Sequence, residues 1–168
     1  MPHPISAIGA VHTVISLIPI FAGIYAFFRY GKIDETTRSG KLYLITTTLA
    51  VLSSFGVSST GGLNAGHAFG ILVLLAAFGG VYVRKMNSVG KIRRYLSVFG
   101  LSFSFLLSLV PGTNETLSRL PTSHPLADGP MSPVVRITLL IWLIVFIVGF
   151  AAQCRRIRSN YRSIRRAT

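Results

Sequence analysis

Residues 61–80, GGLNAGHAFGILVLLAAFGG, are the most informative stretch of this 168-residue chain, and we expect the other segments to pack around it. It begins with a glycine-rich turn and then continues as a long apolar run with His67 near its start. Small residues recur along it at Gly66, Gly70, Ala77 and Gly80. In a membrane helix such residues let a second helix approach closely, and they also leave room for a flat ligand. The stretch therefore predicts a closely packed apolar helix.

Composition and charge placement indicate a membrane protein. Hydrophobic residues make up 51% of the chain and charged residues only 12%. The seventeen basic residues fall mostly into clusters between long uncharged runs. Five of these runs meet or approach the roughly 18 residues that a membrane-spanning helix requires. We expect the spans at about residues 6–28, 42–60, 66–83, 95–111 and 134–152.

The basic clusters predict the orientation of the spans. Fifteen lysines and arginines lie after the first, third and fifth spans, whereas only Arg119 and Arg136 lie on the other side. The positive-inside rule places the N-terminus outside and the C-terminus in the cytoplasm. The first span has no basic residue before its apolar run, so we expect it to remain in the mature protein. In the first inner loop, Asp34 and Glu35 lie among four cations, which favours charge balancing over catalysis.

The distribution of small residues predicts how the spans pack. One face of the first span is small or polar, and it carries Gly9, His12, Ser16, Pro19 and Gly23. The fifth span is bulky around most of its circumference and is expected to face lipid. The sequence thus predicts an all-α membrane protein with a four-helix bundle and a peripheral fifth helix.

We expect one transmembrane domain over residues 1–152 and a basic cytoplasmic tail over 153–168. Within the domain, residues 111–133 contain five prolines and predict a cap over the outer mouth of the bundle. The tail fits either a short interfacial helix on anionic lipid headgroups or a solvated topology determinant. The basic residues are divided among helix ends rather than collected on one soluble face, so no nucleic acid partner is expected.

The start of the third span, GHAFG, together with the outer segment PGTNETLSRLP, resembles small uncharacterised bacterial multi-pass membrane proteins, a domain-of-unknown-function family. The similarity covers most of the chain. It implies a location in the bacterial inner membrane and supplies no catalytic residues.

All four histidines fall on the predicted outer side of the membrane. They are His3 in the N-terminal arm, His12 inside the first span, His67 at the start of the third span and His124 in the cap. An ionisable residue inside a span is a functional hypothesis, because an unpaired buried imidazole is costly. The candidate chemistry is therefore confined to one side.

The leading hypothesis is a structural or interaction role without catalysis. His12 and His67 are then packed residues that hydrogen-bond a neighbouring helix, for instance His12 through Ser54, Ser58 or a backbone carbonyl. Helix faces of this kind also allow an oligomer or another membrane partner.

The second hypothesis is an electron-transfer protein with a b-type haem. His12 and His67 would be its axial ligands, and Gly9, Gly66 and Gly70 would leave room for the ring. If the chain is an enzyme, this chemistry makes it a membrane oxidoreductase.

The third hypothesis is a transition-metal site on the outer face. Histidine and carboxylate side chains are suited to bind zinc or copper. The candidate ligands are His3, His12, His67, His124, Glu115 and Asp128. A small molecule such as a quinone would use the same polar interior.

Overall fold

The computed structural model describes residues 7–57, 65–121 and 123–167. Their regular structure is helical: α1 (Ala7–Tyr30), α2 (Arg38–Ser54), η1 (Phe55–Val57), α3 (Ala65–Lys85), η2 (Asn87–Ile92), α4 (Arg93–Arg119) and α5 (Pro133–Ala167), where η marks a 3-10 helix. Five helices in this part of the chain are long and apolar enough to cross a membrane. The predicted class, an all-helical chain with five such segments, is confirmed.

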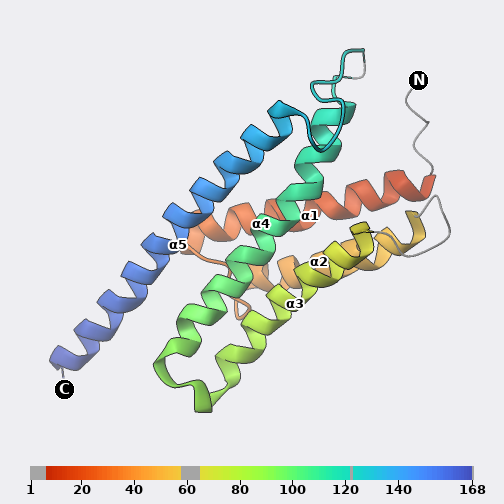
Figure 1. Ribbon diagram of the computed structural model, residues 1–168. Coiled ribbons are helices and arrows are strands. Elements are labelled where there is room, and N and C mark those ends of the chain that lie inside the picture. The colour runs from red at the N-terminus through yellow and green to blue at the C-terminus, as the bar shows by residue number, and fades with distance from the viewer. Residues whose placement is uncertain (1–6, 58–64, 122, 168) are drawn as a thin grey trace.

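Helices that follow one another in the sequence pack side by side (Figure 1): α1 on α2, α2 on α3, α3 on α4 and α4 on α5. The ring of four helices closes where α1 touches α4, through Phe105 packed against Gly23 and Phe27. α5 packs mainly on α4 and is the least buried of the five long helices. This arrangement agrees with a four-helix bundle that carries a fifth helix at its edge.

The small residues of α3 serve helix packing. Gly80 faces Gly100 of α4, where an added Cβ on Gly100 would lie 2.7 Å from the carbonyl oxygen of Ala76 and 2.8 Å from the Cα of Gly80. An added Cβ on Gly70 would lie 3.0 Å from Val51 of α2. Neighbouring helices therefore approach α3 at both glycines.

The small face expected in α1 is confirmed by burial. Gly9, Pro19 and Gly23 are buried. On the opposite face, Phe21 and Phe28 are 67% and 90% exposed. Since large apolar side chains project outward along this helix, its outer surface suits lipid rather than water.

α4 is longer than the sequence predicted. We expected the fourth span to end near residue 111 and the cap to begin there, but the helix continues through Pro111 to Arg119. Proline removes one backbone donor without ending a membrane helix where neighbouring helices support it. Here Trp142 of α5 donates its indole N–H to the hydroxyl of Thr113 at 3.2 Å, so α5 packs on the extension. The connection between α4 and α5 is therefore only residues 120–132.

α5 also passes its predicted end near residue 152 and includes the basic segment as far as Ala167. No glycine or proline interrupts residues 150–167, so nothing in the sequence ends the helix at the edge of the apolar run. The basic tail is thus helical and continuous with α5, and its contact with anionic lipid stays a prediction. α2 starts at Arg38, four residues before its predicted start, and most of the turn expected between α2 and α3 lies outside the described residues.

Candidate functional site

His12 lies in the second turn of α1 and contacts the end of α2. Its Nδ1 is 2.8 Å from the Oγ of Ser53, and its Nε2 is 3.3 Å from the Oγ of Ser16. The hydroxyl of Ser53 donates to the carbonyl oxygen of Ala50 at 2.9 Å, so it accepts a hydrogen bond from the imidazole. The hydroxyl of Ser16 likewise donates to the carbonyl oxygen of His12 at 2.8 Å, so both serine oxygens face the imidazole ring as acceptors.

His67 lies in the first turn of α3 and is 4% exposed. Its Nε2 donates to the carbonyl oxygen of Ser54 at 3.2 Å, and its ring stacks on Phe55 with centroids 4.5 Å apart. Ser54 is the last residue of α2 and lies directly before the 3-10 helix η1. His67 therefore joins the start of α3 to the end of α2.

The two histidines thus contact adjacent residues of α2 from opposite neighbours, α1 and α3. The sequence pointed to Ser54, Ser58 or a backbone carbonyl as the partner of His12. The structure shows Ser53 instead, because the rotation of α2 turns that hydroxyl toward α1. Ser58 lies outside the described residues.

The space beside these histidines suits a haem poorly. Val51 fills the open side of Gly70. Gly9 is buried and its carbonyl accepts from Thr13, whereas Gly66 is exposed. The Nε2 of His67 carries a proton directed at a backbone carbonyl, so this atom has no lone pair for an axial bond. Haem ligation by this pair stays a prediction that the geometry does not support.

The metal hypothesis requires several ligand side chains around one point. Among the residues that the structure describes, no group of three histidine, cysteine or acidic side chains is placed to hold an ion. His124 and Asp128 are exposed in the connection between α4 and α5, and Glu115 pairs with Arg119 along α4. His3 lies outside the described residues. The metal site therefore also stays a prediction.

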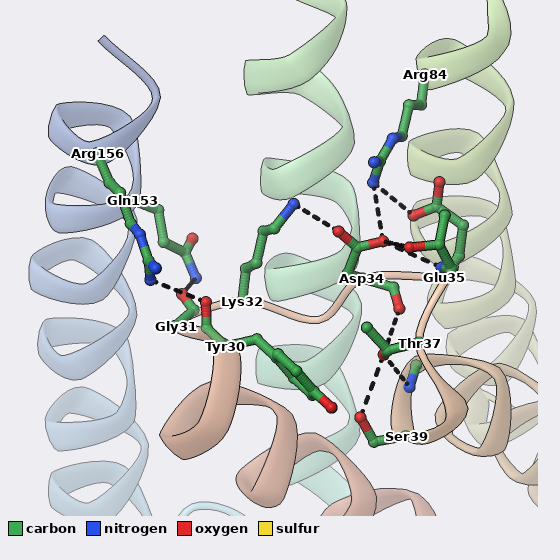
Figure 2. A network of polar contacts seen from close by, with 12 residues as sticks. Tyr30, Gly31, Lys32, Asp34, Glu35, Thr37, Ser39, Arg84, Gln153 and Arg156 are labelled. Atoms are coloured by element: carbon green, nitrogen blue, oxygen red, sulfur yellow. Dashed lines mark hydrogen bonds and ion pairs between the residues drawn. The ribbon is translucent and has the colours of Figure 1, made fainter. Parts of the chain in front are cut away.

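A second polar cluster lies at the opposite end of α1 and α2, and Figure 2 shows its side chains. Lys32 lies 2.6 Å from Asp34. The Nη1 of Arg84, in the last turn of α3, lies 3.1 Å from a carboxylate oxygen of Asp34 and 3.1 Å from one of Glu35. The loop between α1 and α2 is thereby tied to the end of α3.

Asp34 is the centre of this cluster. Its Oδ1 accepts from the backbone N–H of Thr36 at 3.0 Å and from the hydroxyl of Thr36 at 2.7 Å. Burial by itself would raise the pKa of Asp34. Hydrogen bonds from Lys32 and Thr36, with the charge of Lys32, outweigh burial and hold the pKa well below its usual range. The carboxylate is therefore ionised and serves as a structural anchor.

Gln153 and Arg156 attach α5 to the same end of the bundle. The side-chain amide of Gln153 accepts from Ser102 of α4 at 3.1 Å and donates to the carbonyl oxygen of Gly31 at 3.0 Å. Arg156 donates to the carbonyl oxygen of Tyr30 at 3.0 Å (Figure 2). These donors satisfy carbonyl groups at the end of α1 that its own helix leaves open.

These contacts bring the basic clusters together. The loop after α1, the end of α3 with the start of α4, and the basic half of α5 meet at one end of the bundle. This end carries fifteen of the seventeen basic residues and two of the four acidic ones, which equals the whole net charge of +13. The charge of the protein is therefore concentrated at one end of its apolar helices.

Sequence reasoning assigned Asp34 and Glu35 to charge balancing and did not name Arg84 as their partner. The signal was present, because the predicted topology puts the first loop and the end of the third span on the same side. No sequence pattern indicated the partners of Gln153. A single glutamine at the end of a span does not show which residues it bonds, and the structure identifies them as Ser102 and Gly31.

A scan against models of protein families found no match to this sequence. Searches of curated proteins and of solved structures found no similar chain. The resemblance to small bacterial multi-pass membrane proteins therefore stays a prediction, and function must be inferred from the residues of this chain.

Proposed function

We propose that this chain is an integral membrane protein with a structural or interaction role, in which His12 and His67 hold three helices together. One observation carries the proposal: both imidazoles hydrogen-bond consecutive residues at the end of α2, one from α1 and one from α3. Each imidazole thus has a partner on another helix, which explains its presence in an apolar segment.

The contact between His12 and Ser53 provides the test. We expect His12→Ala and Ser53→Ala each to lower the thermal stability of the purified protein in detergent. The double variant should show a coupling free energy of about 0.6 kcal/mol, the average for hydrogen bonds between membrane helices. Thr13→Ala is the matched control, because the Thr13 hydroxyl bonds only the preceding turn of its own helix.

The same samples distinguish the alternatives. Visible spectra of oxidised and dithionite-reduced protein, after expression with ample haem, test for a Soret band. Zinc and copper are counted per chain by elemental analysis. A Soret band or a stoichiometric metal that disappears in His12→Ala and His67→Ala but persists in Thr13→Ala would refute the structural role.

We propose further that the N-terminus lies outside and the C-terminus in the cytoplasm of a bacterial inner membrane. Concentration of the net charge at one end of the helices supports this orientation. Reporter fusions after residue 125 and after residue 168 should report opposite sides. A C-terminal fusion active only outside the cell would overturn the orientation.

A further inference from the structure

A cleft of about 400 Å³ lies between the start of α4 and the basic half of α5. It is lined by Tyr95, Cys154, Arg155 and Arg158. Arg155 and Arg158 are three residues apart on α5 and therefore project from one side of that helix. Its volume is within the usual range for small-ligand pockets.

The two guanidinium groups have no acidic partner in the structure. The carboxylates at this end, Asp34 and Glu35, pair with Lys32 and Arg84. In the part of the chain that the structure describes, neither Arg155 nor Arg158 has an ion pair or a hydrogen bond. Their ten N–H groups together match the oxygens of a phosphate, which guanidinium groups bind through paired hydrogen bonds.

The start of α4 adds to the attraction for an anion. Tyr95 is the third residue of this 27-residue helix, so the cleft lies beside the positive end of the helix dipole. The tyrosine ring borders the cleft, and its hydroxyl can also donate to a phosphate oxygen.

The surface next to the cleft is apolar. One helical turn from Tyr95 lies Phe99, and one turn from Cys154 lies Phe150, and these two rings pack edge to face with centroids 5.3 Å apart. Leu96 and Phe99 are 42% and 39% exposed. An anion in the cleft would therefore have cations on one side and an apolar surface on the other, which is the polarity of a phospholipid.

We propose that this cleft binds the phosphate group of an anionic phospholipid, with its acyl chains along the apolar surface of α4 and α5. The proposal rests on the membrane placement proposed above. It assigns to Arg155 and Arg158 a role that the other cations at this end do not share.

Lipid retention by the full-length protein tests the proposal. Protein purified in detergent with equal amounts of phosphatidylglycerol and phosphatidylcholine is measured by native mass spectrometry. We expect the wild type to retain phosphatidylglycerol selectively. The double variant Arg155→Gln, Arg158→Gln should lose this retention by at least about tenfold, since it removes the paired hydrogen bonds of two guanidinium groups and one hydrogen bond to a charged group is already worth about tenfold or more.

Arg38→Gln with Lys41→Gln is the matched control. It removes two exposed cations from the same end of the bundle, but on α2 and outside the cleft. We expect less than threefold loss. Equal loss in both double variants would overturn the proposal, because it would show attraction by net charge alone.

Two further measurements cover a glutamine variant that does not fold and an anion that is not a lipid. If the glutamine variant does not fold, Arg155→Lys with Arg158→Lys decides: it keeps the charge but loses paired hydrogen bonds, and undiminished retention would overturn the proposal. Inorganic phosphate is added as a competitor. Binding of phosphate that depends on both arginines, without retention of phosphatidylglycerol, would refute a lipid as the source of the anion.

Failure of the membrane placement is distinguishable from failure of the site. In the first case the protein would stay soluble without detergent and would not enter lipid nanodiscs. In the second it would enter nanodiscs but would retain both lipids equally.

Discussion

The hydroxyl of Tyr43 on α2 lies 2.8 Å from the Oγ of Ser104 on α4, and both residues are fully buried. Ser104 itself donates to the carbonyl oxygen of Leu101, so the tyrosine is the donor between the two side chains. Tyr43 also belongs to the apolar cluster that includes Ala26 and Leu101. The residue therefore links helices by its ring and by its hydroxyl.

Replacement of Tyr43 should separate these two contributions. Tyr43→Phe removes only the hydroxyl and should lower the free energy of unfolding by about 0.6 kcal/mol, because Ser104 keeps its bond to the backbone. Tyr43→Ala also removes the ring and should lower it by roughly 3 kcal/mol or more. Unfolding by sodium dodecyl sulfate, followed by circular dichroism, measures both. Equal losses would show that the ring contributes nothing.

Because Gly80 and Gly100 are in close contact, we predict that even one added methyl group at this position destabilises the protein. We expect Gly100→Ala to destabilise the protein by about 1–3 kcal/mol, because α3 and α4 must move apart. Gly79→Ala is the matched control in α3, since nothing lies within 4 Å of its added Cβ. The control should be neutral or slightly stabilising, as alanine favours a helix. Thermal unfolding in detergent compares the two, and similar melting temperatures would contradict the close contact.

Gly40 is a position where the backbone of the first loop excludes any side chain. An added Cβ would overlap the carbonyl oxygen of Asp34. The N–H of Gly40 also donates to the capping hydroxyl of Thr37 at 3.1 Å. Gly40→Ala should therefore cost about 3 kcal/mol or more, whereas Lys41→Ala, one residue further on an exposed position, should have little effect. The yield of folded, monodisperse protein after gel filtration checks this prediction.

Asp34 should make stability depend on pH in the acid range. Its folded pKa is below the unfolded value, so its contribution is complete above that unfolded value, near 3.9, and is lost as the pH falls through the folded pKa. Asp34→Asn should lower stability at pH 7 by on the order of 2 kcal/mol, through lost charged hydrogen bonds.

The pH profile is the decisive measurement for Asp34. Between pH 7 and pH 5 the difference between wild type and Asp34→Asn should be constant, and it should shrink below about pH 4. Glu35→Gln is the control, since among the described residues Glu35 forms one ion pair, with Arg84. A difference that grows on acidification would contradict the assigned role of Asp34.

Much of the fold could be predicted because it depends on local composition. The apolar runs between basic clusters determine five membrane-length helices, and the spacing of Gly9, Pro19 and Gly23 determines which face of α1 is buried. Both properties follow from the period of a helix and from the cost of charge in an apolar medium.

The ends of α4 and α5 could not be predicted in the same way. A helix continues past Pro111 only if neighbouring groups support the segment beyond it. One such support is the hydrogen bond from Trp142 to Thr113, and its partners are 29 residues apart in the sequence, so no local pattern indicates it. The prediction placed the end of α5 near residue 152, where the apolar sequence stops. Polar and basic residues also form helices, so α5 continues beyond that point to Ala167.

Hydropathy and charge placement along the chain were enough to establish an all-helical fold, its five apolar helices and the concentration of charge at their ends. The partners became known only from the packed helices: Ser53 for His12, Arg84 for Asp34 and Glu35, and the neighbouring helices α2 and α4 for Gly70 and Gly80. The physical reason is that hydropathy and charge belong to single residues, whereas these pairings depend on the rotation and register of one helix against another, which no single segment encodes.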